Sequence, residues 1–515
     1  MEISRLRLFL LMVAGLSSSL FLPVMGRGFI HDDFVHLYSA AYHSLWQGLT
    51  CANGGPFYTP VTWLTFRLDW VLWGKNPFLM AAGNLLLHIA NITLLYAFAL
   101  KLWRSQIAAR WAALGFALLF PANTWAVMWI STRAHLLVTF FYLAALIATL
   151  WLARAERRRK LAVIAIVLFA TLSIFSKESG VTSPVAIAIT LIYVRRSERG
   201  KMLPLATIIG LFGSLIAALA VYALIREQSE AIPITFSAAG WYSYAPSLSV
   251  LFENLFRYGW RTYGLLGIMA FAIVLSQIIR GRRPGLDSFT MNSSLLSASL
   301  FATTIAPFIL LRGRSGIYTY LPGIAAALLL GVTARALYEA PLYSVAEVMR
   351  CGASCLLAPV GLSQSASKQL APRLYTVELL PKLLNLLAMT PILLVIALYS
   401  LLTVVHSLRW MRMAEINTFV LNQIVERRIK PQPNTLFILT YSEADSVHGF
   451  PDSLAHGFSC ALRMLYADPT LNGSISRQAE LLQANLRAPV IRLAYIHGGD
   501  GAPRLVITSD ESFVF

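Results

Sequence analysis

Charged side chains are scarce in this sequence. They make up 13% of the 515 residues, whereas 57% of the residues are hydrophobic, and soluble domains carry about a quarter charged residues. A water-soluble fold cannot bury so much apolar surface, so the surplus must face lipid. The shortage of charge excludes an ordinary soluble protein and predicts an integral membrane protein.

Cysteine is scarce as well, with four in the chain. Cys351 and Cys355 have no second pair of His or Cys residues beside them, which argues against a zinc site. Cys51 and Cys460 would both lie outside the cytoplasm in the topology derived below, so a disulfide between them stays open. The sequence also lacks an internal repeat of about 34 residues, which excludes an attached tetratricopeptide array.

Long apolar runs recur up to about residue 405, and a transmembrane helix needs roughly 20 such residues. The first run, RLFLLMVAGLSSSLFLPVM, has no clear small-residue cleavage site, so we interpret it as a retained helix. The mildly apolar stretch 338–382 leaves the count open by one, at about ten or eleven helices. The predicted spans are residues 6–25, 79–102, 108–130, 134–153, 161–176, 180–194, 203–225, 258–279, 293–311, 318–337 and 383–405.

Basic residues gather in short clusters at every second loop. The formal net charge is +18, but this placement is the positive-inside pattern, so it indicates topology and no nucleic-acid partner. The pattern places the N-terminus in the cytoplasm. The clusters are Arg5 and Arg7, then Lys101, Arg104 and Arg110, then 154–160, 195–201 and 280–283. The outer loops are then 26–78, 131–133, 177–179, 226–257 and 312–317.

The composition changes after residue 405. We predict a transmembrane domain at 1–405 and a small α/β domain outside the cytoplasm at 406–515, which makes the fold an all-α polytopic membrane protein with a small C-terminal α/β domain. The first outer loop is expected to form short interfacial helices with Trp46, Trp63, Trp70 and Trp73. The C-terminal elements expected are a helix at 406–431, the strands TLFILTY, VIRLAYI and RLVIT, and a helix at SLAHGFSCALRMLYA.

Ionisable and aromatic residues cluster at the outer ends of the predicted helices. An ionisable group at membrane depth is costly unless it is paired, so each is a functional candidate. The cations among them break the positive-inside trend, so topology does not explain them. The set comprises His31, Asp32, Asp33, His36, Arg133, His135, Lys177, Glu178, Arg312, Arg314, Tyr318 and Tyr320.

Carboxylates beside fixed cations suit sugar transfer from a lipid phosphate. The leaving phosphate is stabilised by Arg or Lys, and a carboxylate takes the proton from the attacking hydroxyl. Asp32 and Asp33 point to different faces of any helix, so one is the base and the other binds the acceptor or a neighbouring His. We expect no cofactor, because Arg and Lys alone can neutralise the leaving group.

Each of these residues also has a structural interpretation. Asp32 and Asp33 could belong to a solvated loop, Lys177 and Glu178 could form a structural ion pair, and Arg133 could reach the lipid headgroups. Tyr318 and Tyr320 could belong to the aromatic belt of the membrane interface. A divalent metal bound by His31, Asp32 and His36 is a further alternative.

Five segments between about residues 20 and 335 carry a family resemblance. They are IHDDFVHL, FYTPVTWLTFRLDWVLWGKNPFLMAAGNLLLHIANITLLY, FPANTWAVMWISTRAHLL, SIFSKESGV and GIYTYLPGIAAALLL. Their order resembles the GT-C superfamily of polyprenyl-phosphate-sugar-dependent glycosyltransferases. The likeness is greatest to protein O-mannosyltransferase-like proteins, the bacterial relatives of the transmembrane and tetratricopeptide-repeat O-mannosyltransferases. Polar residues of that family are replaced here at Thr59, Ala81, Phe120, Trp125 and His135.

The resemblance implies particular roles. The catalytic aspartate would be Asp32 or Asp33, and Arg133, Lys177 and one of Arg312 or Arg314 would bind the donor phosphate. Supporting residues would be His31, His36, Tyr58, His135, Glu178, Tyr318 and Tyr320. The implied activity is that of a hexosyl- or pentosyltransferase in a bacterial inner membrane. It would move one sugar, with inversion, from a polyprenyl-phosphate donor to a protein, glycan or lipid at the periplasmic face.

Two other functions stay open. The replaced polar residues favour a catalytically degenerate scaffold or partner subunit with the same fold. A lipid or glycan transporter is the third alternative, but transporters commonly contain inverted repeats and mid-membrane sites. In this sequence the charged residues gather at one face, and no internal repeat is evident.

Overall fold

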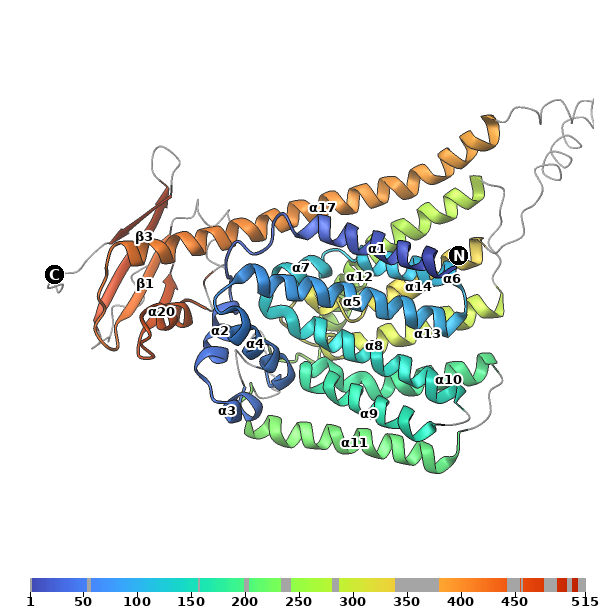
Figure 1. Cartoon of the computed structure of the whole chain (residues 1–515), viewed down its shortest axis with the longest axis horizontal. Helices are drawn as coiled ribbons and strands as arrows, with labels where there is room; N and C mark the ends of the chain where they lie inside the picture. Colours follow the sequence, from blue (N-terminus) through green and yellow to red (C-terminus); the bar gives the residue numbers. More distant parts are fainter. Residues whose placement is uncertain are drawn as a thin grey trace, which may run out of the picture.

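A computed structural model describes residues 2–52, 57–155, 158–198, 203–232, 242–279, 287–338, 379–441, 454, 457–476, 489–497 and 503–507. The stretch 339–378, and with it Cys351 and Cys355, lies outside the described residues. Most of the described chain is a bundle of helices that run along one common direction (Figure 1).

Each predicted span overlaps a helix of this bundle, except that 108–130 covers two helices, α6 and α7. Six described helices are long and apolar enough to cross a membrane, or up to seven if one bent pair counts as a span. The chain is therefore a multi-pass membrane protein. The bundle helices are α1 Glu2–Phe21, α5 Pro77–Trp103, α6 Gln106–Ala117, α7 Ala122–Met128, α8 Arg133–Arg154, α9 Arg159–Ser176, α10 Ser183–Glu198, α11 Leu205–Gln228, α12 Leu248–Ile279, α13 Ser288–Ile305, α14 Gly323–Tyr338 and α17 Leu379–Glu426.

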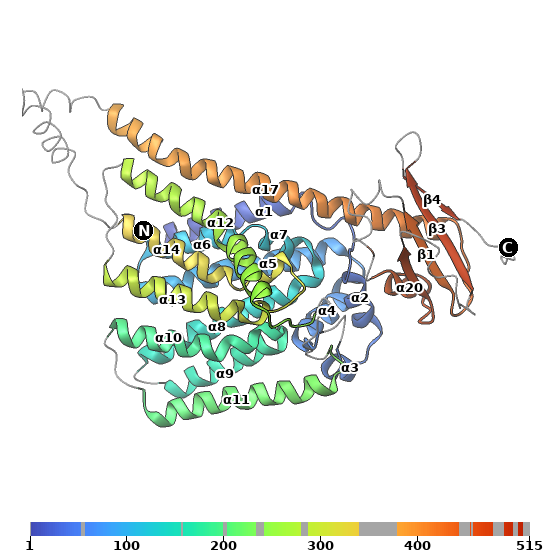
Figure 2. The same cartoon turned by 180° about the vertical axis from the view of Figure 1, so that it is seen from behind.

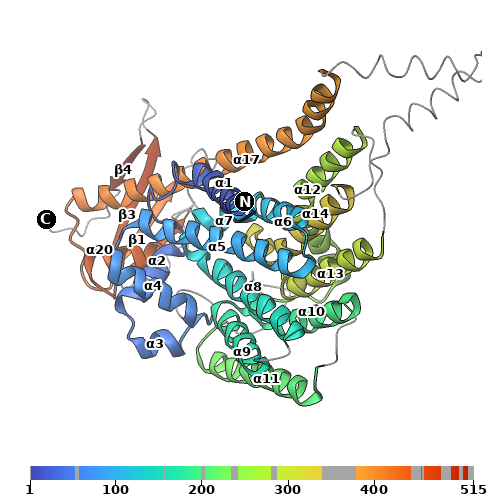
Figure 3. The ribbon, with the colours of Figure 1, turned by 45° about the vertical axis from the view of Figure 1, so that its right-hand side comes forward.

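Small residues allow the central helices to pack closely. Helix α8 lies between α5 on one side and α9 and α10 on the other (Figure 3). Helices α6 and α14 approach so closely at Ala108 that a Cβ on Gly331 would collide with the Ala108 carbonyl oxygen. Close contact through Gly and Ala is the usual way in which helices associate inside a membrane.

The third predicted span, 108–130, is a broken helix. Helix α6 ends at Ala117, α7 begins at Ala122, and the two axes are bent by 63°. The short 3-10 helix η1 Ile130–Thr132 then leads into α8. The Asn84 side chain of α5 donates to the carbonyls of Ala126 at 3.2 Å and Ile130 at 3.2 Å, which satisfies backbone groups freed by the break.

One end of the bundle carries the first outer loop. Its helices are α2 Asp33–Tyr42, α3 Leu45–Thr50 and α4 Pro60–Trp73 (Figure 1). The prediction that Trp63 lies at the membrane interface is wrong: its side chain is buried, and Nε1 donates to Ser39 Oγ at 3.1 Å. At the opposite end of α8, Arg154 forms an ion pair with Glu198 and donates to the Lys101 carbonyl at 2.6 Å.

The predicted domain boundary at residue 405 falls inside one continuous helix. The helix expected at 406–431 is the second half of α17, which runs along the bundle to a small sheet (Figure 2). The sheet order is β2-β1-β3-β4, with β1 parallel to β2 and β3, and β4 antiparallel to β3. The elements are β1 Leu436–Tyr441, α20 Phe458–Tyr466, β2 Asn472–Ser476, β3 Val490–His497 and β4 Pro503–Ile507.

The C-terminal region docks on the first outer loop. Helix α20 packs on α2, and Lys75 Nζ donates to the Met464 carbonyl at 3.4 Å. A Cβ on Gly457 would collide with the His31 carbonyl oxygen, so this contact is backbone to backbone. Cys51 and Cys460 are not joined by a disulfide, and the pairing that the sequence left open is wrong.

Candidate functional site

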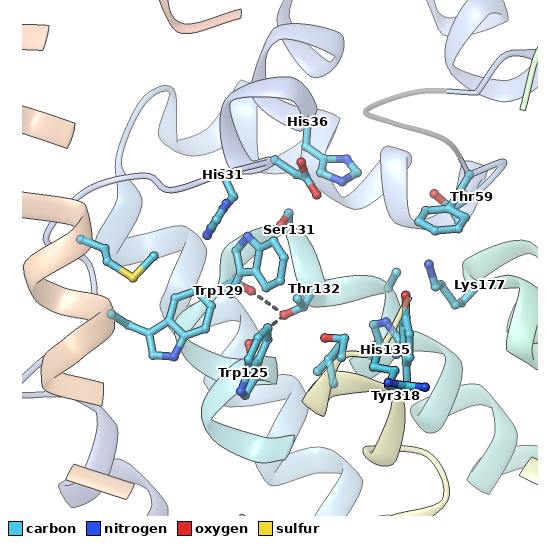
Figure 4. A pocket seen from close by; sticks show the side chains of 18 of the residues that line it. His31, His36, Thr59, Trp125, Trp129, Ser131, Thr132, His135, Lys177 and Tyr318 are labelled. Atoms are coloured by element: carbon cyan, nitrogen blue, oxygen red, sulfur yellow. Dashed lines mark hydrogen bonds between the residues drawn. The ribbon is translucent and has the colours of Figure 1, made fainter. Parts of the chain in front are cut away.

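A cavity of about 420 Å³ lies at the end of the bundle that carries α2. Side chains from the first outer loop, from the turns before α8 and α14, and from α17 line it (Figure 4). Predicted site residues that line the cavity are His31, Asp32, His36, His135, Lys177, Arg314 and Tyr318. The structure therefore brings together predicted residues from four separate parts of the sequence, 31–36, 135, 177 and 314–318.

The two adjacent aspartates have different environments. Asp32 precedes α2 and lines the cavity. Asp33 is buried beneath it, where its carboxylate accepts hydrogen bonds from Ile30 N at 3.0 Å and Ser131 N at 2.7 Å. Burial raises the pKa of Asp33 to about 7, although these hydrogen bonds act in the opposite direction. The geometry thus assigns Asp33 to the support of the loop and leaves Asp32 facing the cavity.

His36 contributes a neutral ring to the cavity wall. Its imidazole stacks on Phe66, with ring centroids 4.8 Å apart and planes 27° apart. Burial, together with the positive charges of Lys177 and Arg133, lowers the pKa of His36 to about 3. The ring therefore carries no charge near neutral pH. On the other side of Asp32, the His31 ring lies 5.2 Å from Trp129.

Lys177 is a buried cation on the cavity wall. Its Nζ lies 3.7 Å from Glu178 Oε2 and 3.5 Å from the centre of the Phe57 ring. Burial lowers the pKa of Lys177, while the charges of Glu178 and Asp32 oppose this shift. The turn that follows is fixed in place, since a Cβ on Gly180 would collide with the backbone of α9.

Arg314 is the second predicted cation that lines the cavity. Its Nε donates to Asn254 Oδ1 at 2.7 Å, and its terminal nitrogens donate to the Glu253 carboxylate at 2.8 and 2.6 Å. Both partners belong to α12, so the guanidinium is oriented from that helix. Tyr318, four residues later, stacks on Phe308 with ring centroids 4.5 Å apart.

Two predicted phosphate-binding residues lie away from the cavity. Arg133 is buried and forms an ion pair with Asp69 at 2.5 Å, while Nε donates to Asn84 Oδ1 at 2.8 Å. It does not line the cavity, and its buried side chain ties α8 to α4 and α5. Arg312 is exposed, and its backbone N donates to the Ser243 carbonyl at 3.1 Å. We therefore leave both residues out of the candidate site.

Two predicted supporting tyrosines are buried in apolar clusters away from the cavity. Tyr58 is buried and donates from its hydroxyl to the Leu49 carbonyl at 2.7 Å. The Tyr320 hydroxyl lies 2.7 Å from His88 Nδ1 and accepts from Asn91 Nδ2 at 3.3 Å. Neither residue lines the cavity, and neither belongs to an aromatic belt.

Solved structures resemble this fold. The crystal structure of ArnT from Cupriavidus metallidurans bound to undecaprenyl phosphate matches with 13% identity over 96% of this chain and 93% of that chain, at a TM-score of 0.52. The apo state of the same protein matches over the same shares with 13% identity and a TM-score of 0.51. The chain has the GT-C fold. No family model and no curated protein sequence matches it.

An oligosaccharyltransferase from Archaeoglobus fulgidus is a more distant neighbour. It matches with 14% identity over 86% of this chain and 61% of that chain, at a TM-score of 0.42. The match to ArnT confirms the GT-C fold that the resemblance implied, and the likeness to O-mannosyltransferases in particular stays a prediction.

Several lining residues of this GT-C cavity escaped the sequence reasoning. Trp129 of the α7–α8 turn stacks on Trp410 of α17, with ring centroids 5.6 Å apart and planes 28° apart. Figure 4 shows Trp125, Trp129 and His31 on one side of the cavity and Lys177, His135 and Tyr318 on the other. Arg409 of α17 also lines it and adds a third cation to Lys177 and Arg314. A signal was available: the segment HSLRWMRM places basic residues at the outer end of the last span, against the positive-inside trend.

Within the part of the chain that the structure describes, no group of three or more His, Cys, Asp or Glu residues is placed to hold a metal ion. The histidines at positions 31 and 36 instead contact aromatic rings.

Proposed function

We propose that this chain is a membrane glycosyltransferase that moves a single sugar from a polyprenyl-phosphate donor to an acceptor hydroxyl, with inversion. The observation that carries the proposal is the charge distribution of the cavity. Among the described residues that line it, Asp32 is the one carboxylate, and Lys177, Arg314 and Arg409 are the cations. This is the set that a reaction with a phosphate leaving group and an attacking hydroxyl needs.

Asp32 is the proposed general base. Its carboxylate takes the proton of the acceptor hydroxyl as that oxygen attacks the anomeric carbon of the donor sugar. The bond between the anomeric carbon and the phosphate oxygen breaks, and polyprenyl phosphate leaves with the bonding electron pair. Attack from the face opposite the phosphate inverts the anomeric configuration.

The cations are proposed to bind the phosphate. Lys177 is buried, so its charge acts on a bound anion with little screening by water. Arg314 is already oriented by Glu253 and Asn254, and it can donate to a phosphate from one edge of the cavity. That a protein with this fold binds undecaprenyl phosphate supports the same kind of donor here.

The positive-inside pattern supports an active site on the periplasmic side of a bacterial inner membrane. The cavity and the basic end of α8, marked by Arg154, lie at opposite ends of the bundle. The acceptor would then be a protein, glycan or lipid that reaches the outer face.

A transfer assay tests the proposal. Purified protein in lipid nanodiscs is supplied with radiolabelled polyprenyl-phosphate hexoses, pentoses and amino sugars, together with an extract of envelope acceptors. We expect label from one donor class to enter an acceptor fraction, and NMR of the product to show the inverted anomer. If no donor is consumed while the folded protein is present, the scaffold alternative replaces the proposal.

A further inference from the structure

A second, smaller cavity adjoins the first. Its volume is about 110 Å³, and it shares Phe57, Lys177, Tyr242 and Tyr318 with the larger cavity. One water molecule needs about 10–15 Å³ of such cavity volume, so the side cavity has room for about seven to eleven water-sized groups. That is close to the heavy atoms of one monosaccharide. Its other polar lining residues are Glu178, Ser179, Arg226 and Tyr244.

Polar atoms of the side-cavity residues lack partners among the described residues. Both carboxylate oxygens of Glu178 are buried and accept no hydrogen bond from a described residue, although Lys177 Nζ lies 3.7 Å from one of them. Ser179 is 2% exposed, and its Oγ makes no hydrogen bond. Arg226 Nε is also buried without a hydrogen-bond acceptor. Burying such an atom is unfavourable unless a ligand or water satisfies it.

We propose that this side cavity binds the sugar ring of the donor, an inference that rests on the proposed function. The unsatisfied atoms define the ligand. Glu178 needs hydrogen-bond donors, Arg226 Nε needs an acceptor, and Ser179 Oγ can serve as either. A ring with neighbouring hydroxyl groups, or one hydroxyl and one amino group, supplies both kinds within the available volume.

Charge explains why the sugar and not the phosphate occupies this cavity. A phosphate placed here would lie against the Glu178 carboxylate, whereas the described lining of the larger cavity offers three cations and one carboxylate. Lys177 lines both cavities and contacts Glu178, so it marks the boundary between phosphate and sugar. The anomeric carbon would then lie at this boundary, on the side of the cavity that Asp32 lines.

Aromatic residues flank the same boundary. Phe57 lies under the Lys177 ammonium group, and its ring packs edge to face on Tyr242 with centroids 5.0 Å apart. Tyr318 also lines both cavities and is fixed by its stack on Phe308. Aromatic walls give a sugar ring an apolar surface to pack on while its hydroxyls reach the polar end of the cavity.

The test separates the sugar from the lipid phosphate. Binding of polyprenyl phosphate and of polyprenyl-phosphate hexose, pentose and amino sugar is measured in nanodiscs for the wild type and for Glu178→Gln. Glu178→Gln keeps the size of the side chain but replaces one acceptor oxygen by a donor. We expect Glu178→Gln to lower the affinity for the sugar-carrying lipid that the wild type prefers by about tenfold or more. The affinity for bare polyprenyl phosphate should change less than about twofold.

Two further variants keep the test decisive. Ser179→Ala removes the buried hydroxyl with little change in volume. It should also lower the affinity for the sugar-carrying lipid, by a smaller factor than Glu178→Gln does. Glu227→Gln makes the same chemical change on the exposed surface of α11 and should leave both affinities unchanged. Equal losses for bare and sugar-carrying lipid in Glu178→Gln, or no loss for either, would overturn the side-cavity assignment while the proposed function stands. A wild type that binds neither lipid overturns both.

Discussion

The Asp33 carboxylate and the Ser131 backbone are joined by a hydrogen bond of 2.7 Å. It links the start of α2 in the first outer loop to the turn before α8, across nearly a hundred residues of chain. Because the same carboxylate also accepts from Ile30 N, it fixes the backbone on both sides of Asp32. The conspicuous acidic pair therefore consists of one supporting residue and one residue that lines the cavity.

Replacing Asp33 should cost stability. In Asp33→Asn one carboxylate oxygen becomes an NH2 group, which cannot accept from Ile30 N or Ser131 N, so one buried donor is left unpaired. We expect a loss of about 1–3 kcal/mol in the free energy of unfolding, seen as a lower melting temperature in detergent. Asp32→Asn is the matched control and should melt close to the wild type. Equal melting temperatures for the two variants would contradict this assignment.

Asp33 and His36 should make opposite contributions to stability as the pH changes. The pKa of Asp33 rises from 3.8 to about 7 on folding, so its contribution is present at low pH and is lost as the pH rises through about 7. The pKa of His36 falls from 6.5 to about 3, so its contribution is present above pH 6.5 and is lost as the pH falls toward about 3. The two trends oppose each other between about pH 4 and 6.5.

Single substitutions should separate these trends. Melting temperatures measured from pH 4 to 7 should fall with rising pH in His36→Gln, where Asp33 acts alone. They should rise with pH in Asp33→Asn, where His36 acts alone. The wild type should lie between the two slopes. Parallel profiles for all three proteins would show that neither group titrates as its burial requires.

Arg133 should matter for folding and not for phosphate binding. Its guanidinium pairs with Asp69 and donates to Asn84 inside the bundle. Arg133→Met leaves Asp69 without its partner, and breaking a buried ion pair typically costs about 3–5 kcal/mol. We expect a low yield and a lower melting temperature, with an unchanged affinity for polyprenyl phosphate in the folded fraction. Asp69→Asn should reproduce the loss of stability. A stable Arg133→Met protein with weakened phosphate binding would contradict the structural role.

Lys177 and Arg409 should contribute directly to phosphate affinity. Replacing either by Met removes a cation from the cavity wall, and a charged hydrogen bond is worth about 1.5–3 kcal/mol. The affinity for polyprenyl phosphate should therefore fall by about tenfold or more for each. Arg412→Met is the control for Arg409, because it removes an exposed arginine from the same helix outside the cavity lining. If Arg412→Met weakens binding as much as Arg409→Met does, the loss comes from general surface charge, and Arg409 has no direct role in phosphate binding.

The helical bundle was predictable because lipid demands long apolar runs. Each predicted span matches a helix, yet the break between Ala117 and Ala122 was missed, since the apolar run continues through it. Strand β2, with the sequence NGSIS, was missed because its sequence carries too little apolar pattern. It has no apolar alternation, and its position beside β1 is set by pairing with a strand distant in the sequence.

The candidate site was predictable in part. Residue type and position on the outer face identified Asp32, Lys177 and Arg314, which line the cavity. The same reasoning selected Arg133, because the sequence does not reveal that Asp69 and Asn84 lie within reach of it. Arg409 and Trp410 were missed: the basic residues at the end of the last span gave a signal, but the sequence does not show that α17 packs beside the cavity.

The most direct test of the account is sugar transfer by Asp32→Asn. The variant is compared with the wild type and with Asp33→Asn in nanodiscs, at equal amounts of folded protein and with saturating polyprenyl-phosphate sugar. The account predicts that Asp32→Asn binds the donor as the wild type does but transfers sugar at least about a hundredfold more slowly, since a general base contributes about 10²–10⁴ in rate. Wild-type transfer by folded Asp32→Asn would contradict it.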